Sequence, residues 1–209
     1  MSKVIRLLPT QVGLIVRGKI NHNHEPGKLE QHADCVLPGG APVGFFGGGG
    51  DASSGSIASI TNFSSGLADG PSGVWNRVGL NMKGFVAYYD DFQQKRPTYV
   101  DLNLAIKYKT VSTLLVINVS ETQAGLFQSY WEQLRLNPGA FNIVGGNCST
   151  HASEAFRHAH ILSKGIPGLD TPNNLYHQLF KLHKDNSHSV AGYLGFRVYR
   201  PGYYEILVS

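Results

Sequence analysis

The residues best suited to chemistry lie in a short stretch around Cys148. The run Phe141-Asn-Ile-Val-Gly-Gly-Asn-Cys148-Ser-Thr-His places a cysteine after an apolar segment and a Gly-Gly turn, where a helix is expected to begin. Unpaired backbone N–H groups and the helix dipole stabilise a thiolate there, and they lower the thiol pKa below its ordinary value of about 8.5. Because the thiolate is the attacking species, the pattern predicts a nucleophile. The same position also suits a small buried cysteine that only packs.

A thiol nucleophile needs a general base, and nine histidines are present in the chain. His151 lies one helical turn from Cys148, but a ring on the same helix is poorly placed to remove the thiol proton. His32 opens a short predicted strand that ends at a tight turn, and a strand start can direct an imidazole toward a helix N-terminus. We therefore predict His32 as the base. The alternative is an edge-strand histidine with no catalytic role.

Length and composition describe a globular chain. The 209 residues are 42% apolar and only 15% charged, which suits one domain over residues 1–209. Glycine and serine concentrate at about 47–82, so we expect an insertion there. The net charge of +4 fits an acidic surface such as a cell wall, but the longest basic cluster is Lys95-Arg96. Specific nucleic-acid binding is therefore not expected.

The cysteine and histidine spacing predicts neither a disulfide framework nor a metal site. Cys35 and Cys148 stand far apart, and the grouping of His22, His24, His32 and Cys35 matches no structural zinc pattern. We expect no cofactor. The longest apolar runs fall short of the roughly 18 residues that span a bilayer, and the N-terminus resembles a strand more than a signal peptide. The expectation is a protein made in the cytoplasm without a Sec signal.

The apolar pattern predicts strands, then helices, then strands, which is typical of an α+β fold. Ser120 and Thr171 suit helix N-caps, and Pro172 suits a first helical position. Helices are expected at 120–137, from about 148 to 162, and from 171 to at least 182. Strands are expected within 4–20 and at 32–37, 43–46, 84–89, 98–104, 113–119, 190–199 and 203–208.

Several of these segments, taken in order, resemble the permuted branch of the NlpC/P60 papain-like superfamily. The segments are His32-Ala-Asp-Cys-Val-Leu, Val43-Gly-Phe-Phe, Gly84-Phe-Val-Ala-Tyr-Tyr-Asp-Asp, Val119-Ser-Glu-Thr-Gln, Asn142-Ile-Val-Gly-Gly-Asn-Cys-Ser and Thr171-Pro-Asn-Asn-Leu-Tyr. More narrowly, the chain is similar to the group found among bacterial type VI secretion effectors and related toxins. Gln31 stands where that family usually has glycine.

The resemblance implies a papain-like fold, in which an antiparallel sheet packs against a helix with the nucleophilic cysteine at its N-terminus. In the family, the cysteine attacks an amide carbonyl, a histidine takes the thiol proton, and a third polar residue orients the histidine. Carried over, these roles fall on Cys148 and His32. Asp34 lies two residues along the strand and shares a face with His32, so it is the first candidate for the third role.

Other polar residues are alternatives on the same grounds. Asp90 and Asp91, from a neighbouring predicted strand, could replace Asp34 as the third member. Asn142, six residues before Cys148, could help to form an oxyanion hole. Each of these residues could equally be an ordinary turn or strand-end residue.

The function that the resemblance implies is a thiol amidase or endopeptidase that cleaves peptidoglycan peptides. The protein would be an antibacterial toxin carried by a type VI secretion system into the target periplasm, with a secretion carrier and a cognate immunity protein as partners. The alternatives are a cysteine protease, deamidase or acyltransferase acting on host protein or lipid, and a catalytically degenerate binding domain.

Overall fold

A computed structural model describes residues 2–26, 32–47, 82–141, 147–163 and 171–209. Within these ranges one nine-stranded sheet, antiparallel at every pairing, is combined with five α-helices. The predicted α+β class is therefore confirmed. Most of the Gly/Ser-rich segment predicted at 47–82 lies outside the described residues.

The strand order in the sheet is β1-β9-β8-β6-β2-β3-β4-β5-β7. The predicted strand segment at 4–20 proves to be two strands with different partners, since β1 pairs with β9 whereas β2 lies between β6 and β3. The strands are β1 (Lys3–Arg6), β2 (Gln11–Arg17), β3 (His32–Val36), β4 (Pro42–Gly47), β5 (Met82–Tyr88), β6 (Val111–Asn118), β7 (Ala140–Phe141), β8 (Ser187–Arg200) and β9 (Tyr203–Val208).

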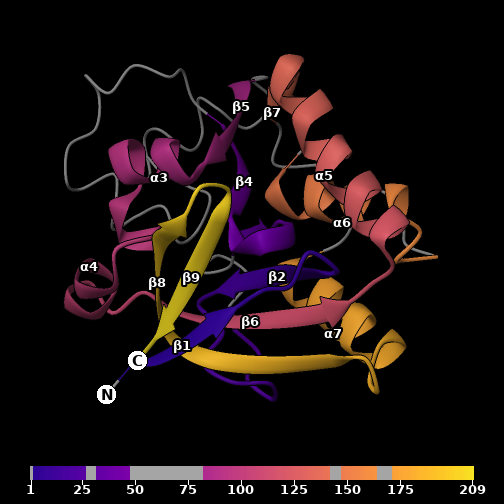
Figure 1. Ribbon diagram of the computed structural model, residues 1–209. Coiled ribbons are helices and arrows are strands. Elements are labelled where there is room, and N and C mark those ends of the chain that lie inside the picture. The colour runs from indigo at the N-terminus through magenta and orange to yellow at the C-terminus, as the bar shows by residue number, and fades with distance from the viewer. Residues whose placement is uncertain (1, 27–31, 48–81, 142–146, 164–170) are drawn as a thin grey trace.

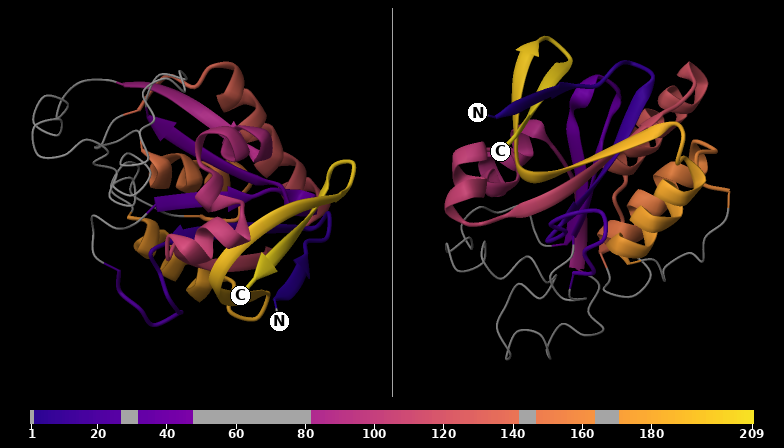
Figure 2. Two further views of the ribbon diagram at one scale, coloured as in Figure 1. Left: turned by 90° about the vertical axis from the view of Figure 1, so that its left-hand side faces the viewer. Right: turned by 90° about the horizontal axis from the view of Figure 1, so that it is seen from below.

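Helices cover both faces of the sheet (Figures 1 and 2). In the view from below, α3 and α4 lie on one side of the central strands, and α5, α6 and α7 lie on the other. The helices are α3 (Tyr89–Lys95), α4 (Leu102–Lys107), α5 (Glu121–Leu136), α6 (Cys148–His158) and α7 (Pro172–Leu182); the 3-10 turns are η1 (Pro38–Gly40) and η4 (Pro97–Tyr99).

The central strands separate two hydrophobic cores. Leu14 and Val16 of β2 join the core beneath α5, α6 and α7, whereas Ile15 joins the core that includes Phe92 of α3. A strand buried on both faces shows a continuous apolar run instead of an alternating one, and this is the pattern of β2. The opposite faces of β3 follow the same division, with Cys35 in the first core and Val36 in the second.

The helix starts are set by local capping. The Ser120 side chain accepts from the Gln123 N–H, and the Gln123 side chain returns a bond to the Ser120 backbone, so a capping box opens α5. Thr171 caps α7 immediately before Pro172. Both predicted starts are confirmed. The Asn147 carboxamide accepts from the Thr150 N–H at 3.0 Å and makes Cys148 the first residue of α6.

Two predictions about local structure are wrong. The segment 98–104 is not a strand: Asp101 accepts from the Leu104 N–H at 2.9 Å and so caps α4 instead. The predicted helix from Cys148 to Leu162 ends earlier, at His158, because His160 adopts a positive φ of 55° that no helix can continue.

We expect the packing of α6 to contribute strongly to stability. Phe156 is fully buried on this helix, with its ring centroid 4.8 Å from that of Phe127. Substitution Phe156→Ala should lower the free energy of unfolding by about 3–5 kcal/mol, because it removes buried apolar area and leaves a cavity. Urea denaturation measures this.

The control is Leu136→Ala on α5, whose side chain is 88% exposed. This surface substitution should change the free energy of unfolding by less than about 0.5 kcal/mol. Equal effects of the two substitutions would contradict the assigned packing of α6.

Candidate active site

The predicted base and the first candidate for its partner lie together at the start of β3. His32 Nε2 and Asp34 Oδ1 are 2.8 Å apart, and both side chains are buried. An ionised carboxylate can only accept, so Nε2 carries the proton and donates it. Residues two apart on a strand share a face, and this places the two groups in contact. The imidazole Nδ1 is thereby left for a partner other than Asp34.

That partner is Cys148. The Cys148 thiol and the His32 side chain are hydrogen-bonded, and the Ala33 backbone N–H donates to the Cys148 sulfur. Helix α6 packs against β3 and β4, so its first residue meets the first two residues of β3. Cys148 is half-buried, whereas His32 is 5% exposed. Cys148 is therefore the more exposed of the two residues.

The environment favours an ion pair over a neutral thiol and imidazole. Burial alone would raise the pKa of Cys148, but His32 and the Ala33 N–H outweigh it and lower that pKa. Burial alone would lower the pKa of His32, but Cys148 and Asp34 outweigh it and raise that pKa well above its ordinary value. Opposite charges in contact favour both charged forms, so a thiolate–imidazolium pair is the stable state between the two pKa values.

Asp34 is held from two sides inside the protein. Its Oδ1 accepts from His32, and its Oδ2 accepts from Arg17 Nε at 2.8 Å. Burial would raise the pKa of Asp34, but these two cations outweigh it and lower that pKa, which keeps the carboxylate ionised. The charge on Asp34 is thus available to stabilise an imidazolium at His32.

Aromatic rings enclose the histidine. The Phe46 ring stacks on the His32 ring with centroids 4.5 Å apart, and the Tyr99 ring lies 5.7 Å away. Gly44 is the Cα partner of Asp34 across the β3–β4 pairing, and a Cβ there would lie 2.3 Å from Asp34 Oδ1. Only a glycine leaves room at that point for the carboxylate that bonds His32.

The other cysteine is chemically distinct. Cys35 follows Asp34 on β3, is fully buried, and is not joined to Cys148 in a disulfide. Burial, followed by the charges of Asp34 and Cys148, raises the pKa of its thiol well above the ordinary value. Cys35 is therefore a packing residue of the core, and the two thiols are expected to react very differently.

The histidine nearest in sequence to Cys148 has other partners. The Tyr130 hydroxyl donates to Glu154 Oε2 at 2.7 Å, and the Tyr130 hydroxyl oxygen lies 2.8 Å from His151 Nδ1. A hydroxyl that donates its single proton to Glu154 must accept from the imidazole, so His151 donates to Tyr130. These contacts hold the His151 ring toward α5, in line with the expectation that it is not the base.

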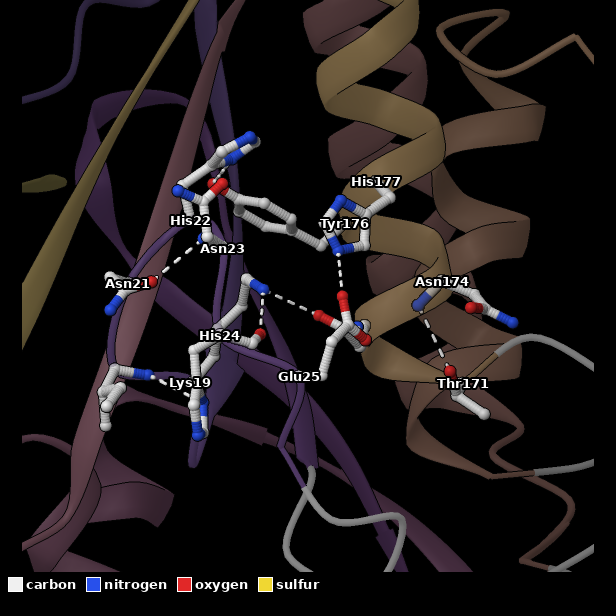
Figure 3. A network of polar contacts seen from close by, with 12 residues as sticks. Lys19, Asn21, His22, Asn23, His24, Glu25, Thr171, Asn174, Tyr176 and His177 are labelled. Atoms are coloured by element: carbon white, nitrogen blue, oxygen red, sulfur yellow. Dashed lines mark hydrogen bonds and ion pairs between the residues drawn. The ribbon is translucent and has the colours of Figure 1, made fainter.

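A second polar network fastens α7 to the segment that follows β2 (Figure 3). Lys19 Nζ is completely buried, donates to the His24 carbonyl at 2.6 Å and to Asn173 Oδ1 at 2.8 Å, and lies over the Tyr176 ring. Glu25 accepts from Asn173 and lies 3.0 Å from His177 Nε2. This network ties the end of β2 to the start of α7.

The predicted site residues have different outcomes. The structure brings Cys148, His32 and Asp34 together, whereas Asp90 and Asp91 lie in the first turn of α3 and not on a strand. Asp91 accepts from the Tyr88 N–H and pairs with Arg135, and Asp90 is exposed. These two residues therefore do not take the third role. Asn142 lies outside the described residues.

Sequence reasoning missed Arg17 and Gly44 as parts of the site. Arg17 directly follows the apolar run Val12–Val16 of β2 and is only 2% exposed. A charged residue at the end of such a run is the signal that could have pointed to it, because a buried charge needs a partner. The restriction at Gly44 depends on a cross-strand contact, for which the chain gives no local signal.

Within the described residues, no cluster of three or more His, Cys, Asp or Glu side chains is arranged to bind a metal ion. No helix in the same ranges combines the length and hydropathy needed to cross a membrane. No protein-family model, curated protein or solved structure matches the chain.

The pKa directions predict how the two thiols respond to pH. Because the pKa of Cys148 is lowered, its alkylation by iodoacetamide should reach half its maximal rate at a pH below about 8.5, the ordinary thiol value. The rate should fall only as the pH drops through this lowered pKa and the thiolate is protonated. Peptide mass spectrometry at a series of pH values measures each cysteine separately.

Cys35 is the internal control, since its raised pKa and complete burial should leave it unlabelled throughout neutral pH. A Cys148 profile centred at or above about pH 8.5 would contradict the thiolate–imidazolium pair.

The close contact at Gly44 predicts a site defect from a single methyl group. In Gly44→Ala, the new Cβ must displace the Asp34 carboxylate, so the pH midpoint of Cys148 alkylation should move upward as His32 loses its partner. The matched control is Gly125→Ala on α5, where a Cβ meets nothing within 4 Å. That control should keep the wild-type profile and raise the free energy of unfolding by up to about 1 kcal/mol.

Proposed function

We propose that this protein is a thiol hydrolase of amide bonds, with Cys148 as nucleophile, His32 as general base and acid, and Asp34 as the group that orients His32. The observation that carries the proposal is the continuous hydrogen-bonded line from Cys148 through His32 to Asp34. A nucleophile, a base within hydrogen-bond reach and a third group orienting the base form the recurring arrangement of nucleophilic hydrolysis.

The proposed reaction begins with attack of the Cys148 thiolate on the amide carbonyl carbon. The carbonyl electrons move to the oxygen, and backbone N–H groups in the first turn of α6 are the donors suited to stabilise that oxyanion. The His32 imidazolium gives its proton to the leaving nitrogen, the C–N bond breaks, and a thioester to Cys148 remains. Water, deprotonated by His32, then attacks the thioester, and Cys148 leaves as the thiolate.

A papain-like fold of the permuted type is part of the proposal. It is supported by the antiparallel sheet, by a histidine on a strand that precedes the cysteine in the chain, and by a cysteine at the first position of a helix packed on that sheet. The motif resemblance around His32, Cys148 and Thr171 agrees with it.

For the substrate we propose a peptide of bacterial peptidoglycan, on the basis of the same resemblance and the net charge of +4. Delivery as an antibacterial toxin through a type VI secretion system, with a carrier and an immunity protein, rests on the resemblance. The same thiol chemistry would serve cleavage, deamidation or acyl transfer on a protein or lipid, and these are the alternatives that the experiment must separate.

The test is muropeptide analysis of purified peptidoglycan treated with the wild type, Cys148→Ala or His32→Ala. Wild type should release new muropeptides whose masses identify the cleaved bond. Cys148→Ala should release none, and His32→Ala should lower the rate at least about 100-fold, the usual contribution of a general base. His158→Ala, an exposed histidine at the end of α6, is the matched control and should retain full activity.

The outcomes separate the candidate functions. Unchanged muropeptides together with fast Cys148 alkylation at neutral pH would exclude the wall and direct the search to proteins and lipids. A Cys148 that reacts no faster than a free thiol would instead favour a binding domain that has lost catalysis.

A further inference from the structure

The side chain of Arg17 is buried and is fixed by three hydrogen bonds. It is the last residue of β2 and the Cα partner of His32 across the β2–β3 pairing. Its Nε donates to Asp34, its two terminal nitrogens donate to Ser112 Oγ at 3.3 Å and to the Tyr99 carbonyl at 3.2 Å, and the guanidinium lies over the Tyr99 ring. All three nitrogens are therefore used, and the fork has one orientation.

This fixed fork determines where the Asp34 carboxylate can lie. One carboxylate oxygen bonds Arg17 and the other bonds His32, at 2.8 Å in each case. Because both oxygens are engaged from opposite sides, the carboxylate cannot rotate without breaking one of the two charged contacts. The orientation of the His32 ring toward Cys148 thus depends on Arg17, whose side chain is hydrogen-bonded to neither His32 nor Cys148.

We propose that Arg17 is a positioning residue of the hydrolase, and that it also keeps Cys148 ionised by balancing the charge of Asp34. This inference rests on the proposed function. Charges alternate along Arg17, Asp34, His32 and Cys148, and the sum of two cations and two anions is zero. Without Arg17 the buried group would carry one excess negative charge, which is strongly unfavourable in an interior.

The excess charge would be removed by a proton on Cys148. A thiolate has a much higher proton affinity than a carboxylate, with ordinary pKa values of about 8.5 and 3.9. Asp34 would keep the imidazolium as its remaining counterion, and the sulfur would become a thiol. Loss of Arg17 should therefore lower the reactivity of Cys148, which is three hydrogen-bonded contacts away.

Other charged and titratable groups face this line and limit the size of the effect. Arg96, which precedes η4, is close enough to Asp34 for their charges to interact. Tyr99 of η4 lies against Arg17, and Cys35 of β3 is close enough to Asp34 and Cys148 to interact with their charges. Arg96 remains as a second cation near Asp34, so we expect a shift in the pH profile of Cys148 and not a complete loss of its reactivity.

The experiment is a double-substitution cycle read out by the pH midpoint of Cys148 alkylation, resolved from Cys35 by peptide mass spectrometry. The variants are Arg17→Met, Asp34→Asn and the pair combined. Arg17→Met should move the midpoint upward and lower the rate at pH 6 by about tenfold or more, since one pKa unit is a tenfold change in thiolate fraction. The shift of the combined variant should differ from the sum of the two single shifts, because Arg17 acts through Asp34.

Controls make the result decisive. Arg197→Met removes an exposed arginine of β8 and should leave the profile unchanged. Arg17→Lys keeps the charge and one bond to Asp34, so its pH midpoint should lie between those of wild type and Arg17→Met. If circular dichroism shows that Arg17→Met is unfolded, the midpoint of Arg17→Lys serves as the test instead.

A folded Arg17→Met protein with the wild-type midpoint would overturn both roles of Arg17, as would additive shifts in the cycle. A folded Arg17→Lys protein with the wild-type midpoint would overturn the positioning role, because that variant keeps the charge and loses only the fork. Any of these results would leave the proposed function intact if wild-type Cys148 has its lowered midpoint. A wild-type midpoint like that of a free thiol would instead overturn the proposed function itself.

Discussion

The arrangement of the site depends on one buried carboxylate. Asp34 is completely buried, and an unpaired charge in such a place would be strongly destabilising. Two cations resolve this, His32 from the same strand and Arg17 from the next. Their positions require the observed β2–β3 pairing, a glycine opposite Asp34 on β4, and the Tyr99 carbonyl from η4 to hold the guanidinium. Four separate elements thus meet at one carboxylate.

Cys148, the proposed nucleophile, comes from outside this arrangement, on a helix whose start is determined locally. Asn147 caps α6 through the Thr150 N–H, and it also accepts from the hydroxyl groups of Ser149 and Thr150. The cysteine therefore sits at the positive end of the helix dipole before any contact with His32 is considered. Helix dipole and imidazolium therefore favour the same charge state of the Cys148 sulfur.

The parts of the fold and site that could be predicted are those with local signals. Ser120, Thr171 and Cys148 mark helix starts through capping and turn chemistry, and His32 begins an apolar strand. The β-branched and aromatic residues of 98–104 favour a strand, but Pro97 begins the 3-10 turn η4 and the Asp101 cap begins α4. The third member of the site could be narrowed only to Asp34, Asp90 or Asp91. Strand periodicity shows which face of the strand a side chain occupies, but it does not show which residue that side chain contacts. Arg17 required knowledge of which strand lies beside β3.

The spacing of His32 and Asp34 on a single strand links the site to the alignment of the whole sheet. Side chains alternate between faces along β3, so sliding this strand by one residue against β2 would turn both groups toward α5, α6 and α7 and replace them with Ala33 and Cys35. Asp34 would then lose Arg17 and lie unpaired in an apolar core. The slipped pairing is therefore penalised by the same charges that form the site. A chain that assembles β3 in the wrong register would therefore lose both the Cys148–His32–Asp34 contacts and part of its stability.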